Sequence, residues 1–392
     1  MNIKKIFFFT YTHAAQNRLE RYGTDIFKRY GYDVEIWDFM PIIYPHYHSD
    51  QKENNLLRYE YYKIFNNVEG FITNLRGMEK ESFIVSFLPY NQKTHPIYRE
   101  ISLRDLAYSV FVANALPAGS VSNNWRCRVL GLMKKFKKLN WNNLKSFVFH
   151  RIPFSQLGVS PAAVSLMGGE RSGDILKMFP VGQSTKKVWA HQMDYDDVLR
   201  ESATKVQEKD IAVFIDDDMP FHKEYKLFKV KPFVTADRYY SSINNFFNTI
   251  EKEFKIRVVI AGCPRSSYTD RINCFGGRDI HLKKTPELVR SARFCIVHAS
   301  TAINYVVAYR KPFLLISSDE LDKSLIAGVI NNFSRLFSKK KINIESPSIG
   351  NLKDELVVNN SLYDEYMNSY IKKRGSKEKL LWEIFIEELK AL

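Results

Sequence analysis

Residues 257–317 read RVVIAGCPRSSYTDRINCFGGRDIHLKKTPELVRSARFCIVHASTAINYVVAYRKPFLLIS, and this stretch decides the fold. It holds three apolar runs, which are Val258–Ala261, Phe294–Val297 and Phe313–Ile316. Helical patterns separate the second run from the first and the third, at Thr285–Ser291 and Ala302–Tyr309. Strands that alternate with helices predict a parallel sheet covered by helices. Ligands bind such sheets at the carboxyl ends of the strands, so we expect an anion-binding site after the first two runs.

The polar residues after these two runs have the chemistry that such a site needs. Ser300 and Thr301 lie just before a predicted helix, where both are preferred capping residues and where free N–H groups attract a phosphate. His298 is placed to donate to a phosphate oxygen, and Arg265, between Pro264 and Ser266, could hold a phosphate or carboxylate with two hydrogen bonds. The alternative is that Ser300 and Thr301 form an ordinary helix cap.

A glycine-containing loop follows the first apolar run. Gly276 and Gly277 allow backbone to approach a ligand closely, and Arg278 adds a positive charge beside them. Long loops at this edge of a sheet are usually functional. A simple glycine turn with a surface arginine is the alternative, and the sequence does not decide between the two.

An earlier apolar run, Ile211–Ile215, ends in Asp216, Asp217 and Asp218. One of these carboxylates could act as a general base, activated by the like charge of its neighbours. A magnesium site would need substrate phosphates to complete it, so we expect no obligatory metal and no cofactor. The alternative is that the aspartates cap the turn before Pro220.

The first half of the chain also predicts alternating strands and helices. Residues 3–9 and 33–37 read as strands on either side of a helix at 17–30, the opening of a doubly wound domain. The remaining elements predicted here are helices at 54–68, 103–116 and 195–201 and strands at 82–88, 162–167 and 187–191. Polar residues at strand ends then predict the acceptor side of a cleft, and they are Thr10, His13, Gly168, Gly169 and Glu170.

The polar segment 201–210 predicts a domain boundary. We therefore expect an α/β protein with two doubly wound, Rossmann-like domains, the first over residues 1–203 and the second over 204–350. A chain of 392 residues is long enough for two such cores. The tail from Leu362 to Leu392 has a helical apolar face.

The net charge of +15 predicts contact with anions. Residues 126–151 carry many lysines and arginines, interleaved with apolar side chains, and hold no acidic residue. This composition is typical of a helix that lies on a membrane surface, with Lys134, Lys135, Lys137 and Lys138 toward the lipid. The bland alternative is a solvated basic helix face. No apolar run reaches the ~20 residues needed to span a bilayer, so we expect a cytoplasmic protein.

These features resemble the GT-B glycosyltransferases: two doubly wound halves, a polar linker and a long C-terminal helix. The resemblance implies two domains that face a cleft, a C-terminal half that binds a nucleotide sugar, and last helices (residues 351–392) that pack back on the first domain. It covers residues 211–317 well and the first half only in architecture.

A narrower resemblance is to bacterial enzymes that use CMP-activated sugars, the sialyltransferases and the Kdo transferases of capsule synthesis. Their pattern is His-Pro after one strand and Ser-Ser/Thr after the next. The matching positions here are Cys263-Pro264 and Ser300-Thr301. Cys263 replaces the histidine that would bind the nucleotide, and we expect His298 or Arg265 to substitute for it.

The sequence therefore predicts a glycosyltransferase that is peripheral to the anionic inner membrane and builds a surface glycan such as a capsule or lipopolysaccharide. The donor is a nucleotide sugar, with CMP-nonulosonate or CMP-Kdo ahead of an NDP-hexose, and the acceptor is a glycan or a lipid-linked sugar. Alternatives are an NDP-hexose transferase and a nucleotide-sugar 2-epimerase. A nucleic-acid-binding protein or a non-catalytic scaffold ranks lower, because no nucleic-acid-binding motif is found and no nucleic-acid partner is expected.

Overall fold

The computed structural model describes residues 3–11, 21–46, 61–113, 117, 149, 151–202, 206–271, 273–346 and 352–392. The chain forms two compact units. The described residues before Asp194, Pro117 excepted, form the first unit together with Lys372–Leu392. Asp194–Ile371, with Pro117, form the second unit, which therefore begins before the predicted boundary at residue 204.

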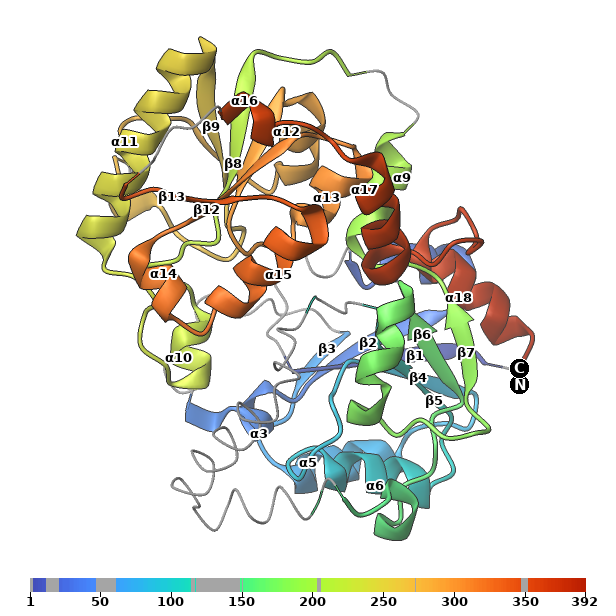
Figure 1. The fold of residues 1–392 in the computed structure, drawn as a ribbon. Coiled ribbons are helices and arrows are strands. Elements are labelled where there is room, and N and C mark those ends of the chain that lie inside the picture. Colours follow the sequence, from blue (N-terminus) through green and yellow to red (C-terminus); the bar gives the residue numbers. More distant parts are fainter. Residues whose placement is uncertain are drawn as a thin grey trace. The chain divides into compact units, whose positions relative to one another are not determined.

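The first unit is built on a seven-stranded parallel sheet in the order β3-β2-β1-β4-β5-β6-β7 (Figure 1). Its strands are β1 (Lys5–Thr10), β2 (Asp33–Asp38), β3 (Tyr62–Ile64), β4 (Ser82–Ser86), β5 (Tyr108–Phe111), β6 (Val164–Met167) and β7 (Lys186–Trp189). Its helices are α2 (Thr24–Arg29), α3 (Met40–Ile43), α5 (Val68–Arg76), α6 (His95–Leu103), the 3₁₀ helices η2 (Phe154–Leu157) and η3 (Glu170–Met178), and α18 (Leu381–Lys390).

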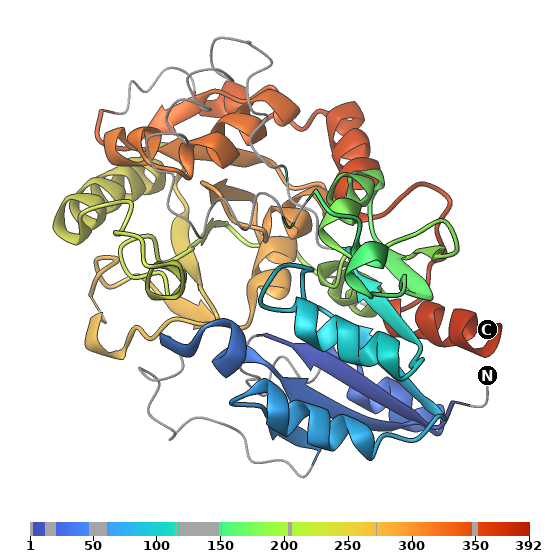
Figure 2. The ribbon, with the colours of Figure 1, turned by 90° about the horizontal axis from the view of Figure 1, so that it is seen from below.

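The side chains of β1 point alternately to the two faces of this sheet and pack on both. Phe8 packs on one side with Trp382 of α18, and Phe7 and Phe9 pack on the other with Trp37. Side chains of a strand point to alternate faces, so an uninterrupted run such as Phe7-Phe8-Phe9 belongs in a sheet that is covered twice. Figures 1 and 2 show α5 and α6 on one side of the sheet and α18 on the other.

The second unit repeats this design with a six-stranded parallel sheet in the order β10-β9-β8-β11-β12-β13. Its strands are β8 (Ile211–Ile215), β9 (Arg257–Gly262), β10 (Ile280–Leu282), β11 (Phe294–Val297), β12 (Phe313–Ser317) and β13 (Lys341–Asn343). Its helices are α9 (Asp194–Glu201), α10 (Glu224–Phe228), α11 (Ala236–Phe254), η4 (Thr269–Arg271), α12 (Thr285–Ser291), α13 (Ile303–Ala308), α14 (Asp319–Lys323), α15 (Ala327–Phe337), α16 (Leu352–Glu355), α17 (Asn360–Tyr366) and the π-helical turn η5 (Met367–Ile371).

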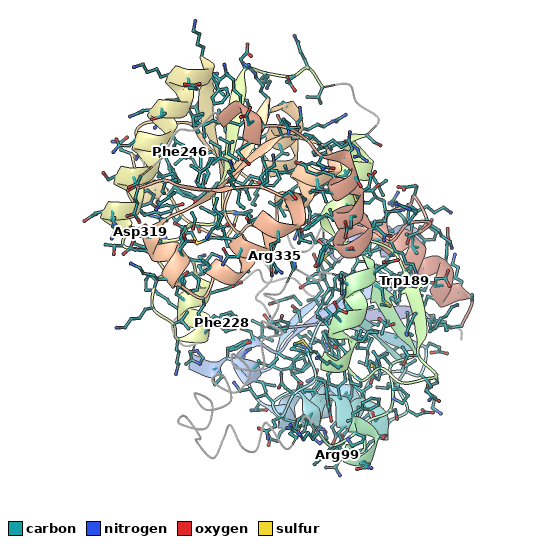
Figure 3. All side chains as sticks on the ribbon, viewed as in Figure 1. Arg99, Trp189, Phe228, Phe246, Asp319 and Arg335 are labelled. Carbon is teal, nitrogen blue, oxygen red and sulfur yellow. The ribbon has the colours of Figure 1, made fainter. Side chains whose placement is uncertain are left out.

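Helix α11 supplies much of the second core. Apolar side chains recur along it every three or four residues and are buried against the sheet, as Figure 3 shows for Phe246. This spacing gives a helix one apolar face, so the sequence alone predicts which side meets the strands. The face consists of Tyr239, Ile243, Phe246, Phe247, Ile250 and Phe254.

The predicted fold class is confirmed, since both units hold a doubly wound parallel sheet of Rossmann type. Three predicted helices are corrected. The helix at 103–116 is wrong, because 108–111 form β5. The helix at 54–68 is wrong where it is described, because 62–64 form β3. The C-terminal helix is interrupted between Ile371 and Leu381, around Gly375 with its φ of 82°.

Candidate functional site

The switch point of the second sheet lies between β8 and β11. Both strands lie at the centre of the sheet, and Phe214 of β8 pairs with Ile296 of β11. The next residues of the two strands therefore emerge at the same edge, where ligands bind in sheets of this order. Those residues are the three aspartates Asp216, Asp217 and Asp218 and, opposite them, His298.

Asp216 is buried and held from two sides. The Tyr268 hydroxyl donates to its Oδ2 over 2.6 Å, and the Asp218 backbone N–H donates to its Oδ1 over 2.9 Å. Burial raises the pKa of the Asp216 carboxyl to about 6, against the opposing effect of these hydrogen bonds. Asp216 therefore serves to close the turn after β8, because both its oxygens are bound within the unit.

Asp218 is also buried, and its charge is neutralised by Arg271. Nη1 of Arg271 lies 2.7 Å from Oδ1 of Asp218, and Nη2 lies 3.1 Å from Oδ2. Arg271 also donates to the Tyr240 hydroxyl and the Ser267 carbonyl, which fixes the loop after β9. Asp218 adopts the left-handed conformation (φ 51°), so it turns the chain sharply as well as binding the arginine.

Asp217 is the most exposed of the three aspartates. Its side chain is 20% exposed, whereas Asp216 and Asp218 are buried. Its Oδ2 lies 3.0 Å from Nδ1 of His298, whose Nε2 lies 2.9 Å from the Tyr239 hydroxyl. Among the three carboxylates, Asp217 is thus the one best placed to meet a ligand.

The structure corrects the predicted role of His298. The prediction had this histidine donate to a phosphate, but the side chain is fully buried and both ring nitrogens contact protein partners. His298 can therefore support Asp217 from behind, and it cannot reach a ligand in this arrangement.

Ser300 and Thr301 lie beside this edge, but they do not cap α13 as predicted. The residue before α13 is Ala302, with no side-chain cap, and Ser300 Oγ accepts weakly from the Ala302 N–H over 3.3 Å. Ser300 is buried and Thr301 is exposed. Thr301 is therefore the hydroxyl of this pair that is open to a ligand.

The loop after β9 contains Pro264, Arg265 and Ser266. Arg265 is exposed and donates to Glu224 over 3.1 Å, with His222 within 3.4 Å of its guanidinium. The Ser266 N–H donates to the Cys263 carbonyl, so the turn around the exposed Pro264 is closed by backbone. An exposed ion pair such as Arg265–Glu224 is weak, and a stronger anion can exchange for the carboxylate.

The glycine loop is locked to α11 by its arginine. Arg278 donates to both carboxylate oxygens of Glu251 and to the side-chain oxygens of Asn244 and Asn248. Gly276 and Gly277 have φ values of 62° and 78°, which a glycine adopts without strain. Arg278 is occupied by these partners, so the geometry favours the simple structural interpretation of the loop.

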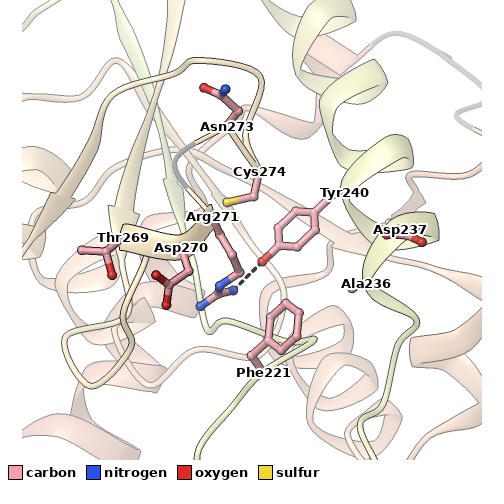
Figure 4. Close-up of a pocket in the computed structure, with 9 residues that line it drawn as sticks. All are labelled: Phe221, Ala236, Asp237, Tyr240, Thr269, Asp270, Arg271, Asn273 and Cys274. Atoms are coloured by element: carbon pink, nitrogen blue, oxygen red, sulfur yellow. Dashed lines mark hydrogen bonds between the residues drawn. The ribbon is translucent and has the colours of Figure 1, made fainter.

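A shallow pocket of about 510 Å³ lies on this side of the second unit (Figure 4). Arg271 stands in it beside Phe221 and Tyr240, with its guanidinium carbon 4.3 Å from the centre of the Phe221 ring. The remaining lining residues are Ala236, Asp237, Thr269, Asp270, Asn273 and Cys274. Aromatic walls and a polar rim suit a ring-shaped ligand more than a bare phosphate, because Arg271 is already paired.

In the first unit, Thr10 ends β1 and accepts a hydrogen bond from the Tyr22 hydroxyl over 2.9 Å. Gly168 and Gly169 follow β6, where the Gly168 N–H donates to Ser172 Oγ, and Glu170 is exposed. His13 lies outside the described residues, as do Lys134, Lys135, Lys137 and Lys138. Thr10, Gly168 and Gly169 are buried, so among the acceptor-side residues that the structure describes Glu170 is the one exposed to solvent.

Three residues of the site were missed from the sequence: Tyr239, Tyr268 and Arg271. The apolar spacing of residues 239–254 predicts a helix, and nothing in that pattern marks Tyr239 as a site residue. Tyr268 and Arg271 lay in a loop whose conformation no periodicity predicts. Their only signal was a tyrosine and an arginine near a strand end.

The described part of the chain contains no cluster of three His, Cys, Asp or Glu side chains arranged to hold a metal ion. In the same residues, no helix is both long and apolar enough to cross a bilayer.

No protein-family model and no curated protein matches this chain. Solved structures do match it over their whole length at low identity. The glycotransferase of kitacinnamycin has a TM-score of 0.50 at 8% identity, with 100% of both chains covered. UDP-GlcNAc 2-epimerase from Methanocaldococcus jannaschii has a TM-score of 0.48 at 9% identity. MurG from Acinetobacter baumannii has a TM-score of 0.46 at 10% identity. Each match covers 99% of this chain and 100% of the other chain. With its two doubly wound sheets, the chain shares a GT-B-like fold with the first of these structures.

Proposed function

We propose that this protein is a glycosyltransferase that moves a sugar from a nucleotide donor to an acceptor hydroxyl. The observation that carries the proposal is the asymmetry of the three aspartates after β8. Two are buried and bound within the unit, and the third, Asp217, is partly exposed and contacts His298. A partly exposed carboxylate held at the switch point of a doubly wound sheet is suited to general-base chemistry.

In the proposed reaction, Asp217 accepts the proton of the acceptor hydroxyl as its oxygen bonds to the anomeric carbon of the donor. The bond from that carbon to the donor phosphate breaks, and its electron pair leaves with the phosphate. The Thr301 hydroxyl would stabilise the leaving phosphate, together with Arg265 released from Glu224. Thr301 is already exposed for this role, whereas Arg265 must first leave Glu224.

The charge at the strand ends supports a CMP-sugar as the donor. Asp216, Asp217 and Asp218 follow one another at the end of β8, and of these three Arg271 is paired with Asp218 alone. A CMP-sugar carries a single phosphate charge, whereas an NDP-sugar carries two, so carboxylates repel it less. CMP-nonulosonate and CMP-Kdo are therefore the donors that we favour.

The donor test is a thermal-shift screen with CMP, CDP, UDP and GDP and their sugar conjugates. A ligand at about 100 times its Kd adds about 2.7 kcal/mol to the stability of the folded state. We expect CMP and its conjugates to raise the melting temperature. A shift with UDP or GDP alone would move the proposal to an NDP-hexose transferase or a 2-epimerase, and no shift at all would contradict a nucleotide-sugar enzyme.

The catalytic test is Asp217→Asn in the full chain. We expect transfer from the stabilising donor to fall about 10²–10⁴-fold, with the nucleotide still bound. Asp279→Asn, an exposed change outside this site, is the control. Formation of a C2 epimer of the donor without an acceptor would identify an epimerase instead.

We further propose that the acceptor is a glycan or a lipid-linked sugar at the inner membrane, reached through the basic segment 126–151. The support is its charge and apolar content, which suit an anionic leaflet. The wild-type protein should sediment with vesicles that contain phosphatidylglycerol, and the fourfold change of Lys134, Lys135, Lys137 and Lys138 to Gln should release it. Equal binding by this variant, or tighter retention on DNA or RNA, would overturn the idea.

A further inference from the structure

Three buried or half-buried side chains form a chain of hydrogen bonds behind the candidate site. Tyr239 comes from the first turns of α11, His298 follows β11, and Asp217 follows β8. The distances are 2.9 Å from the Tyr239 hydroxyl to His298 Nε2 and 3.0 Å from His298 Nδ1 to Asp217 Oδ2. One helix and two central strands thus converge on a single imidazole.

The direction of these hydrogen bonds follows from the chemistry of the two ends. Burial, with the nearby charge of Asp216, raises the pKa of Tyr239 well above its usual value, so its hydroxyl stays protonated. An ionised carboxylate only accepts hydrogen bonds. His298 then donates from Nδ1 to Asp217, and in a neutral imidazole this leaves Nε2 to accept from Tyr239.

The imidazole has no freedom to change this arrangement. His298 is fully buried, and the ring of Phe214 packs against it edge to face, with centroids 5.3 Å apart and planes at 90°. Asp217 uses Oδ2 for the imidazole, while its Oδ1 has no hydrogen bond to any residue that the structure describes. One oxygen of the carboxylate is therefore held in place and the other is presented outward.

We propose that Tyr239 and His298 are positioning residues, which fix the tautomer of His298 and through it the orientation of the Asp217 carboxylate. The proposal rests on the proposed function for what Asp217 then does, namely to accept a proton. Beyond that function, it assigns one tautomer to His298 and makes the orientation of the Asp217 carboxylate depend on the buried hydroxyl of Tyr239.

The direct test is ¹⁵N NMR of histidine-labelled full-length protein. The chain has nine histidines, and His298 is assigned from the signal that is missing in His298→Gln. We expect the His298 signal of the tautomer with Nδ1 protonated and Nε2 bare, and a shift of its Nε2 resonance in Tyr239→Phe. Tyr363→Phe is the matched control, because Tyr363 is a buried tyrosine of the same unit whose hydroxyl donates elsewhere, to the Lys311 carbonyl.

Either of two results would overturn the proposal: a His298 protonated at Nε2 and bare at Nδ1, or an Nε2 resonance that Tyr239→Phe leaves unchanged. Should His298→Gln fail to fold, Asp217→Asn serves for assignment, since it should move the Nδ1 signal of His298 alone. These spectra need no substrate, so they decide the proposal even where the thermal-shift screen contradicts a nucleotide-sugar enzyme.

The kinetic test uses the donor identified by that screen. Tyr239→Phe should lower kcat about three- to tenfold, the loss expected for one hydrogen bond, and leave the donor KM unchanged. His298→Gln, whose amide can still donate to Asp217, should retain more activity than His298→Leu. A Tyr239→Phe enzyme with wild-type kcat, or with a changed KM and unchanged kcat, would contradict the positioning role.

Discussion

Arg271 binds Asp218 through both of its terminal nitrogens, at 2.7 and 3.1 Å, and so ties the loop after β9 to the end of β8. Asp218 is almost completely buried, and Arg271 is mostly so. The same guanidinium stacks on Phe221, which lines the pocket. One ion pair thus determines both the turn that carries Asp217 and the wall of the pocket.

Arg271→Gln should destabilise the second unit by about 3 kcal/mol, since it leaves the Asp218 carboxylate buried without its partner. Urea unfolding followed by circular dichroism measures the loss. Tryptophan fluorescence is an internal control, because residues 194–371 contain no tryptophan and the signal therefore reports the first unit. Arg265→Gln, which breaks the exposed pair with Glu224, should cost less than about 1 kcal/mol. Equal losses for the two variants would contradict the structural role of Arg271.

Asp216 should make the second unit less stable as the pH rises. Burial raises the pKa of its carboxyl to about 6 from its ordinary value of 3.8, so the folded state holds this proton more tightly than the unfolded state does. Protonated Asp216 stabilises the folded state fully below its unfolded-state pKa of 3.8. This stabilisation is lost as the pH rises through the folded-state pKa of about 6. Asp216→Asn removes this ionisation, and its advantage over the wild type should grow by about 1 kcal/mol between pH 5 and pH 8. If the unfolding free energies of the variant and the wild type in urea differ by a constant amount across this pH range, the raised pKa of Asp216 is contradicted.

Gly23→Ala should disrupt the packing of α18 in the first unit. Gly23 has a φ of 60°, and a Cβ there would overlap the indole ring of Trp382. Gly31 has a φ of 84° and open space around it, so Gly31→Ala tests the backbone strain alone. We expect about 1 kcal/mol of destabilisation for Gly31→Ala and about 1–3 kcal/mol more for Gly23→Ala, measured by tryptophan fluorescence in urea. Similar losses would mean that the indole moves aside freely.

Thr301→Ala should weaken nucleotide binding about tenfold and leave the melting temperature of the free protein unchanged, because Thr301 is exposed and would bind a charged phosphate. Ser300→Ala should have the smaller effect on affinity, since Ser300 is buried and its hydroxyl contacts the Ala302 N–H. Calorimetric titration with the nucleotide from the screen gives both affinities. The reverse order would assign the phosphate contact to Ser300.

The sequence was most predictive where an apolar run is short, β-branched and ended by polar residues. The run Ile211–Ile215 forms β8 at the predicted residues. A short helical pattern was predicted equally well, since Thr285–Ser291 forms α12 with both ends as expected. By contrast β5 lies in a long, evenly apolar segment that fits a helix equally well. In such a segment the position in the sheet, next to β4 and β6, decides the structure, and no local pattern records it.

The candidate site was predictable in its location and not in its contacts. Apolar runs placed Asp217 and His298 at the same sheet edge, and the register of β8 with β11 brings them within hydrogen-bond distance. Nothing local linked Tyr239 to His298, which lies 59 residues later in the chain. That contact depends on how α11 packs over the sheet. Only the folded unit therefore shows that His298 supports Asp217 and does not itself bind a ligand.

The return of the chain to the first unit after Ile371 has a consequence for biosynthesis. Trp382 and Phe385 fill the same core as Phe8 and Phe27, although the ribosome makes them only after the whole second unit. The first unit therefore cannot complete this core until residues that follow the second unit in the chain have been made, and its apolar surface stays uncovered until then. The half of the protein that is synthesised first is thus still incomplete after the second half has been made, and in that interval its uncovered apolar surface is exposed to aggregation and to chaperones.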